Sequence, residues 1–221
     1  MPSLRFLRSR PVAIFLAVLL LAIVSLAAKQ FVMPSAKQAK TYPAHDEHST
    51  EGVAVAADPY DTADKASIFT AHYGEQGLLP IFVVITNDGN EPVSLSSMQA
   101  QFVTAGRAKL IPSSTDDIYR RLSRPTTNGG KSYPLPFPTK KVKGGVSKET
   151  QDEITNSQFN AKAVEPHSTQ AGFMFFDVTG ISDPLPGARL FLTGVHDSKG
   201  NELLYFEIPM ENYLSAPQKV N

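Results

Sequence analysis

A cluster of basic side chains is the feature of this sequence best suited to binding chemistry. Two arginines at the end of a predicted helix and three lysines in the long connection after it form the cluster: Arg120, Arg121, Lys140, Lys141 and Lys143. Two aromatic residues, Tyr133 and Phe137, lie in the same connection. Lysines beside aromatic rings suit an anionic surface, since the charges attract headgroups or polymer and the rings add contact area. Binding of anionic lipid or cell-wall polymer through the basic 131–148 loop is therefore one interpretation of these residues.

The charge distribution supports a second interpretation of this loop. Residues 107–148 hold ten basic and two acidic residues, whereas residues 149–221 hold four basic and ten acidic residues. Oppositely charged blocks that fold against each other neutralise each other. A solvated loop neutralised by acidic neighbours is therefore the favoured interpretation, with an anion-binding surface as the alternative.

Two further groups of residues have the side chains of metal ligands. His45 and His48 could share a metal only if their segment turns or is helical, and no third histidine lies nearby. A solvated segment is the favoured interpretation, with a metal site as the alternative. Asp58, Asp61 and Asp64 recur at intervals of three but do not match a calcium-loop motif. A helix cap at residue 61 or 62 explains their spacing better, so we expect no metal and no cofactor.

No catalytic motif is present in the sequence. Gly-x-Ser-x-Gly, His-Glu-x-x-His and Gly-rich phosphate loops are all missing. The chain has no cysteine, which excludes a thiol nucleophile, a thiolate metal site and disulfides. His167 could pair with Asp177 in space, but a histidine in a turn is the simpler interpretation. We therefore expect that the protein is not an enzyme, with an envelope hydrolase as a remote alternative.

The first 28 residues predict export. Residues 1–10 contain three arginines, and residues 11–28 are uncharged and mostly apolar. This length fits either a transmembrane anchor or a long signal sequence cleaved near Ala27. The arginines place the amino terminus in the cytoplasm, and no N-glycosylation sequon occurs. We expect a bacterial inner-membrane protein with a periplasmic domain, or a secreted or periplasmic protein after cleavage. Expected partners are the membrane, through residues 11–28, and an envelope protein or polymer, but no nucleic acid.

The remaining chain predicts a mainly β domain. Residues 81–86 consist of five β-branched residues and Phe82, which is typical of a buried strand. Asn87-Asp88-Gly89-Asn90 then predicts a hairpin turn into a second strand over residues 93–104. The apolar alternation changes phase within that second strand, which indicates a bulge or a crossing between sheets. Later strands are expected over residues 173–179, 188–195 and 201–208, and the last two form a hairpin.

Helices are expected only in the connections between strands. Short helices over residues 63–69, 116–122 and 149–159 each follow a residue suited to capping. One face of the strand at 188–195 is mixed and the other is apolar. Together these patterns predict an antiparallel β-sandwich of about seven strands.

Two stretches resemble the immunoglobulin-like domains of bacterial envelope proteins, many of which have unknown function. They are Val-Val-Ile-Thr-Asn-Asp-Gly-Asn-Glu-Pro-Val and Val-Glu-Pro-His-Ser-Thr-Gln-Ala-Gly-Phe-Met-Phe-Phe. The resemblance implies a non-catalytic, membrane-tethered extracytoplasmic module that binds or stabilises envelope components. The expected organisation is a flexible linker at 29–51, an immunoglobulin-like sandwich at 52–214 with a helical and loop insertion at 107–163, and a tail at 215–221.

Overall fold

The computed structural model describes residues 30–123 and 145–217, and its folded unit begins at Phe31. The predicted anchor at 11–28, the loop lysines Lys140, Lys141 and Lys143, and the last four residues lie outside the described residues. Within the described residues, no helix combines the length and the apolar character needed to cross a bilayer.

Ten strands and several short helices alternate along the described chain. In order they are η1 (Ala39–Thr41), β1 (His45–His48), β2 (Val53–Pro59), α2 (Ala63–Ala66), η2 (Gly74–Gln76), β3 (Leu78–Asn87), β4 (Val93–Ser94), β5 (Gln99–Val103), β6 (Lys109–Leu110), α3 (Thr115–Ser123), α4 (Lys148–Ser157), β7 (Ala163–Val164), β8 (Ser168–Asp177), β9 (Arg189–Thr193), β10 (Phe206–Pro209) and α5 (Glu211–Leu214).

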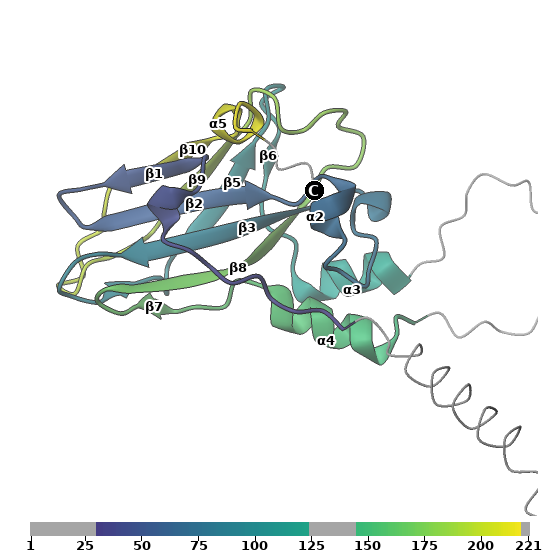
Figure 1. Cartoon of the computed structure of the whole chain (residues 1–221), viewed down its shortest axis with the longest axis horizontal. Helices are drawn as coiled ribbons and strands as arrows, with labels where there is room; N and C mark the ends of the chain where they lie inside the picture. Colours follow the sequence, from purple (N-terminus) through teal and green to yellow (C-terminus); the bar gives the residue numbers. More distant parts are fainter. Residues whose placement is uncertain (1–29, 124–144, 218–221) are drawn as a thin grey trace, which may run out of the picture. The chain divides into compact units, whose positions relative to one another are not determined.

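The strands form three sheets in which every pairing of strands is antiparallel. One four-stranded sheet has the order β1-β2-β3-β8, a second has the order β10-β9-β5-β6, and β4 pairs with β7. Figure 1 shows the first sheet running along the domain, with α2, α3 and α4 gathered at one end. The prediction of a mainly β, antiparallel fold with few helices is confirmed, although η1 precedes the first strand and α5 follows the last.

Strand β3 is buried along its whole length, on both faces of its sheet. Ile81, Val83 and Ile85 pack into the core that the two large sheets share. Phe82 and Val84 pack on the opposite face into a second core, which contains Phe173, Phe175, Ile118 of α3 and Ile154 of α4. The β-branched run at 81–86 is therefore a central strand between two apolar layers, as its composition predicts.

The prediction of a β3–β4 hairpin is wrong. Both neighbours of β3 are other strands, β2 and β8, while β4 pairs with β7 and β5 lies in the opposite sheet. The Asn87 side chain explains the different path: its amide donates to the carbonyls of Glu91 (2.8 Å) and Val164 (3.0 Å) and its oxygen accepts from Gly89 N–H (2.9 Å). These bonds direct the chain across to the second sheet, and that crossing is one of the two explanations offered for the phase change.

The prediction of a flexible linker over residues 29–51 is also wrong. Strand β1 pairs with β2, and the ring of His48 stacks on Phe206 with centroids 4.1 Å apart. Upstream, Phe31 stacks on Phe69 at 5.6 Å, and Ala39 is fully buried. The segment has no apolar periodicity of its own, so its order comes from partners elsewhere in the chain. One of these contacts lies at the edge of the second sheet, where β10 is the last strand. There the Asp46 carboxylate accepts a hydrogen bond from the backbone N–H of Glu207 (2.9 Å).

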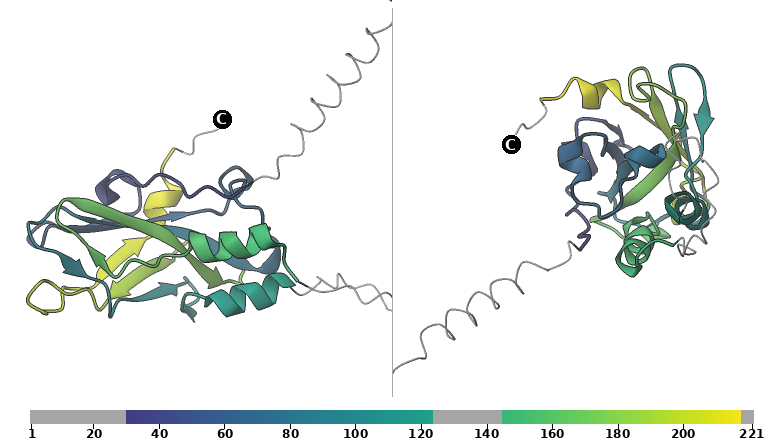
Figure 2. Two further views of the ribbon diagram at one scale, coloured as in Figure 1. Left: turned by 90° about the horizontal axis from the view of Figure 1, so that it is seen from below. Right: turned by 90° about the vertical axis from the view of Figure 1, so that its right-hand side faces the viewer.

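The helix caps follow the prediction. Thr62 caps α2, Ser147 caps α4, and Ser114 Oγ accepts from Asp117 N–H at 3.2 Å while donating to its carboxylate at 2.6 Å. Figures 1 and 2 show α3 and α4 side by side, and Gln158 beyond α4 donates to Thr115 Oγ1 at 2.9 Å.

A buried carboxylate fixes α4 to the segment before β3. Glu153 is only 2% exposed. Its carboxylate accepts from the backbone N–H and hydroxyl of Thr70 (2.5 and 2.6 Å) and from Ala71 N–H (3.3 Å). Burial, and after it the negative charge of Glu153, raise the pKa of nearby Tyr73. Hydrogen bonds to a charged acceptor are stronger than those to a neutral one, so the three donors offset much of the free-energy cost of burying this carboxylate.

We expect Glu153→Gln to lower the free energy of unfolding by about 1.5–3 kcal/mol, because an amide nitrogen would then face backbone donors. Urea denaturation followed by far-UV circular dichroism measures this loss. Asp152→Asn, one residue away on the exposed side of α4, is the matched control and should shift stability by less than about 0.5 kcal/mol. Equal effects of the two substitutions would contradict the anchoring role.

Candidate functional site

A surface hollow of about 700 Å³ lies where β6, α3 and the end of β8 meet. Its lining comes from the segment 109–113, from α3 and from the end of β8: Lys109, Leu110, Ile111, Pro112, Ser113, Asp117, Arg120, Arg121, Asp177 and Thr179. The hollow thus contains both arginines of the predicted basic cluster.

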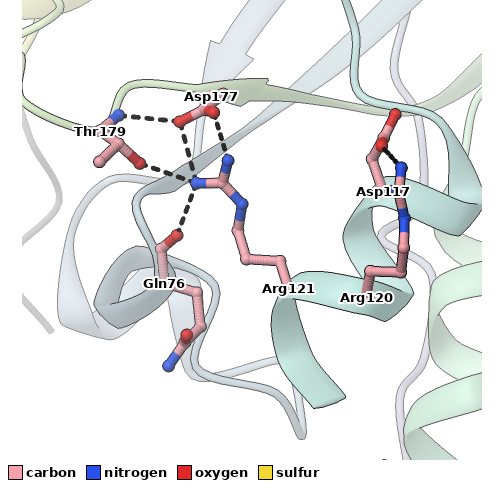
Figure 3. A network of polar contacts seen from close by, with 6 residues as sticks. All are labelled: Gln76, Asp117, Arg120, Arg121, Asp177 and Thr179. Atoms are coloured by element: carbon pink, nitrogen blue, oxygen red, sulfur yellow. Dashed lines mark hydrogen bonds and ion pairs between the residues drawn. The ribbon is translucent and has the colours of Figure 1, made fainter. Parts of the chain in front are cut away.

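Arg121 is bonded on several sides (Figure 3). Its guanidinium makes an ion pair with the Asp177 carboxylate and donates to Thr179 Oγ1 (2.7 Å) and to the Gln76 carbonyl (3.0 Å). Burial would raise the pKa of Asp177, but hydrogen bonds from Arg121 and Thr179, together with the arginine charge, outweigh it and lower that pKa. Arg121 therefore ties α3 to β8 and η2, and this pair joins the basic 107–148 block to the acidic block after it.

Arg120 has a carboxylate partner as well. It forms an ion pair with Asp117 one turn earlier on α3, on the more exposed side of the helix. The hydrogen bond from Ser114, and then the charge of Arg120, lower the pKa of Asp117. Both arginines thus have carboxylate partners, but only Arg121 is paired with the acidic block after residue 148, because Asp117 belongs to the same basic block as Arg120. Anion binding by Lys140, Lys141 and Lys143 lies outside the described residues and stays a prediction.

A second hollow, of about 480 Å³, lies beside the first on the outer face of the β10-β9-β5-β6 sheet. Its lining is uncharged: Met98, Gln99, Ala100, Gln101, Ile111, Pro112, Phe191 and Thr193. Ile111 and Pro112 line both hollows. Ile111 is 72% exposed, which is unusual for so large an apolar side chain.

The histidines considered as metal ligands are held by other contacts. His45 Nδ1 lies 2.6 Å from the Tyr42 carbonyl, and His48 Nδ1 lies 2.8 Å from Glu51 Oε2. Because β1 is extended, residues three apart point to opposite faces of the strand. Among residues 30–123 and 145–217, no group of three or more histidine or acidic side chains is arranged to hold a metal ion.

The three spaced aspartates also have structural partners. Asp58 makes an ion pair with Lys65 (2.5 Å), and Asp61 accepts from the hydroxyl of Tyr213 in α5 (2.6 Å). Burial raises the pKa of Asp58 despite the lysine. Asp64 lies in the first turn of α2, just after the Thr62 cap. The cap interpretation therefore describes this segment better than a cation site.

His167 and Asp177 do not form a pair. Asp177 is bound by Arg121 at the far end of β8, whereas His167 lies just before that strand with a φ of 54°. His167 lies in a turn, as the simpler of the two interpretations predicts.

The uncharged hollow contains residues that motif reasoning missed. Gln101 and Phe191 match no motif, and they meet only because β5 and β9 pair in the register that places them opposite each other. One sequence pattern does indicate Phe191: the alternation of side-chain types over residues 188–195 predicts a strand with one mixed face, and Phe191 belongs to that face. The strand register is needed to find the partner residues on β5.

Comparisons with known proteins assign no family. No protein-family model matches the chain, and no curated protein matches it. Among solved structures, the X-ray structure of Northeast Structural Genomics Consortium target SoR45 is similar over 77% of this chain and 96% of that chain. The sequence identity is 9% and the TM-score is 0.31. A similarity of this size carries no information about function.

We expect Arg121→Ala to lower the free energy of unfolding by about 1 kcal/mol, a value kept small because the pair is partly solvated. Since the pKa of Asp177 is lowered in the folded state, the pair stabilises fully above the ordinary pKa of aspartate, near 4. Its contribution is lost as the pH falls through the lowered value. Urea midpoints at neutral and acidic pH should therefore differ more for the wild type than for the variant. Arg120→Ala is the matched control and should change stability by less than about 0.5 kcal/mol.

Proposed function

We propose that the chain is a non-catalytic, membrane-tethered extracytoplasmic module that binds a component of the bacterial cell envelope. The observation that carries this proposal is the uncharged hollow on the outer sheet face, with the exposed Ile111 on its border. Concave surfaces with apolar walls and a few polar groups are typical of binding sites. Gln99 and Gln101 supply such polar groups here, and among the described residues neither amide has a hydrogen-bonding partner.

The strand order supports an immunoglobulin-like fold for this module. In immunoglobulin-type sandwiches, the first, second and fifth strands share one sheet, and the third, sixth and seventh share the other. Here β2, β3 and β8 are neighbours in one sheet, and β5, β9 and β10 are neighbours in the other. Helices α3 and α4 lie between β6 and β8, within the predicted insertion at 107–163.

The amino-terminal sequence supports the membrane tether. Arginines precede an uncharged apolar stretch at 11–28, as in an anchor or signal segment with a cytoplasmic amino terminus. A domain without cysteine is also suited to an oxidising compartment, since it has no thiols to mispair there.

Protease treatment of intact spheroplasts tests the location. We expect added protease to degrade an epitope at the carboxyl terminus, and alkaline carbonate to leave the chain in the membrane pellet. If the segment is cleaved near Ala27 instead, the chain appears in the periplasmic fraction with a shortened amino terminus. Protection of the epitope until the cells are lysed would contradict extracytoplasmic exposure.

Photo-crosslinking in intact cells tests the binding role. A benzoylphenylalanine residue at Gln101 should give a discrete adduct with an envelope component, identified by mass spectrometry. The same residue at Asp152, on the exposed side of α4, is the control and should give none. Absence of an adduct from Gln101, or the same adducts from both positions, would contradict a binding site in the uncharged hollow.

A further inference from the structure

The outer face of the β10-β9-β5-β6 sheet presents an ordered row of side chains. Phe102, Leu190, Leu192 and Phe206 are completely buried in the core between the sheets. Because side chains alternate along a strand, their neighbours point outward. The register places Gln101 opposite Phe191 and Gln99 opposite Thr193.

Two aromatic rings lie close together here: Phe191 lines the hollow, and Tyr205 is its neighbour outside that lining. The centroids of Phe191 and Tyr205 are 6.2 Å apart, and their planes are inclined by 47°. Tyr205 is 55% exposed and adjoins the buried Phe206 at the start of β10. The two rings therefore offer apolar surface to solvent rather than to the core.

The polar side chains that line the hollow on this face are neutral. The carboxamides of Gln99 and Gln101 and the hydroxyl of Thr193 each combine a hydrogen-bond donor with an acceptor. The charged neighbours, Arg189 on β9 and Glu207 on β10, form an ion pair with each other. The hollow therefore offers a ligand both hydrogen-bond donors and acceptors. The charges of Arg189 and Glu207 beside it are paired with each other.

We propose that this face binds a neutral saccharide chain of the cell envelope. A sugar ring presents apolar C–H faces that can pack on Phe191 and Tyr205, and hydroxyls that match the mixed donors and acceptors of the glutamines. The volume of about 480 Å³ falls within the range of small-molecule sites. Ile111, which also lines the hollow, adds further exposed apolar surface. This inference rests on the proposed binding function and names the ligand class for the same hollow.

Two other ligand classes fit the face less well. An anionic polymer would need cations in contact with it, but the lining of this hollow is uncharged and nearby Arg189 is paired with Glu207. A peptide added as an extra strand needs an open sheet edge, whereas this hollow lies on a sheet face.

Co-sedimentation of the detergent-purified full chain with insoluble glycans tests the proposal. The probes are cellulose, chitin and peptidoglycan sacculi stripped of protein, each at low and high salt. We expect the wild type to sediment with at least one glycan, and high salt to leave the bound fraction unchanged because the contacts are neutral. Phe191→Ala should weaken binding about tenfold to a hundredfold, as expected when a ring loses its buried contact.

Three further variants separate binding from folding. Gln101→Ala should also weaken binding, while Phe191→Tyr, which keeps the ring, should retain it. Tyr119→Ala removes a partly exposed ring from α3, outside the hollow, and should bind like the wild type. Far-UV circular dichroism should be the same for all variants.

Two outcomes would overturn the proposal. One is a wild type that sediments with none of the three glycans, and the other is sedimentation that Phe191→Ala and Gln101→Ala leave unchanged. Salt-sensitive sedimentation independent of these residues would point to the lysines instead. A protein adduct from the crosslinker at Gln101 without glycan binding would overturn the saccharide inference alone, whereas absence of both would overturn the proposed function too.

Discussion

The burial of β3 on both faces is the constraint on which the rest of this fold depends. A strand with apolar side chains on both sides must be covered by two separate layers. The second sheet covers one side, where Val83 packs with Leu190 and Leu192. The amino-terminal segment, α3 and α4 cover the other side, where Phe82 packs with Phe173. Because that second layer has no sheet of its own, it needs individual anchors, and the buried carboxylate of Glu153 is one of them.

Local signals in the sequence predicted local structure well. The β-branched run predicted β3, and Ser114, Ser147 and Thr62 predicted helix starts, because a cap bonds backbone groups only three residues away. Predictions failed where the deciding contact is distant. The turn residues after β3 are typical of a hairpin, yet the bond from Asn87 to the Val164 carbonyl leads the chain away. The polar sequence of β1 becomes a strand only through β2 and Phe206.

The same distinction applies to the site. Charge counts led to Arg120 and Arg121, but in the fold Arg121 ties α3 to β8 and Arg120 pairs with Asp117 within α3. Gln101 and Phe191, which line the uncharged hollow, belong to no sequence motif. Their proximity depends on the β5–β9 register, which a single sequence does not specify. Because both arginines are paired within the fold, the neutral side chains of the outer sheet face are the better guide to a binding site.

The bond between Asp46 and the Glu207 amide also affects how the molecule behaves at high concentration. Strand β10 ends its sheet, and a free row of backbone donors there would invite a second copy to extend the sheet. The carboxylate from β1 occupies one of those donors, and the proline at position 209 removes another. At high concentration, molecules can therefore stay separate at this edge, without growth into filaments by added strands.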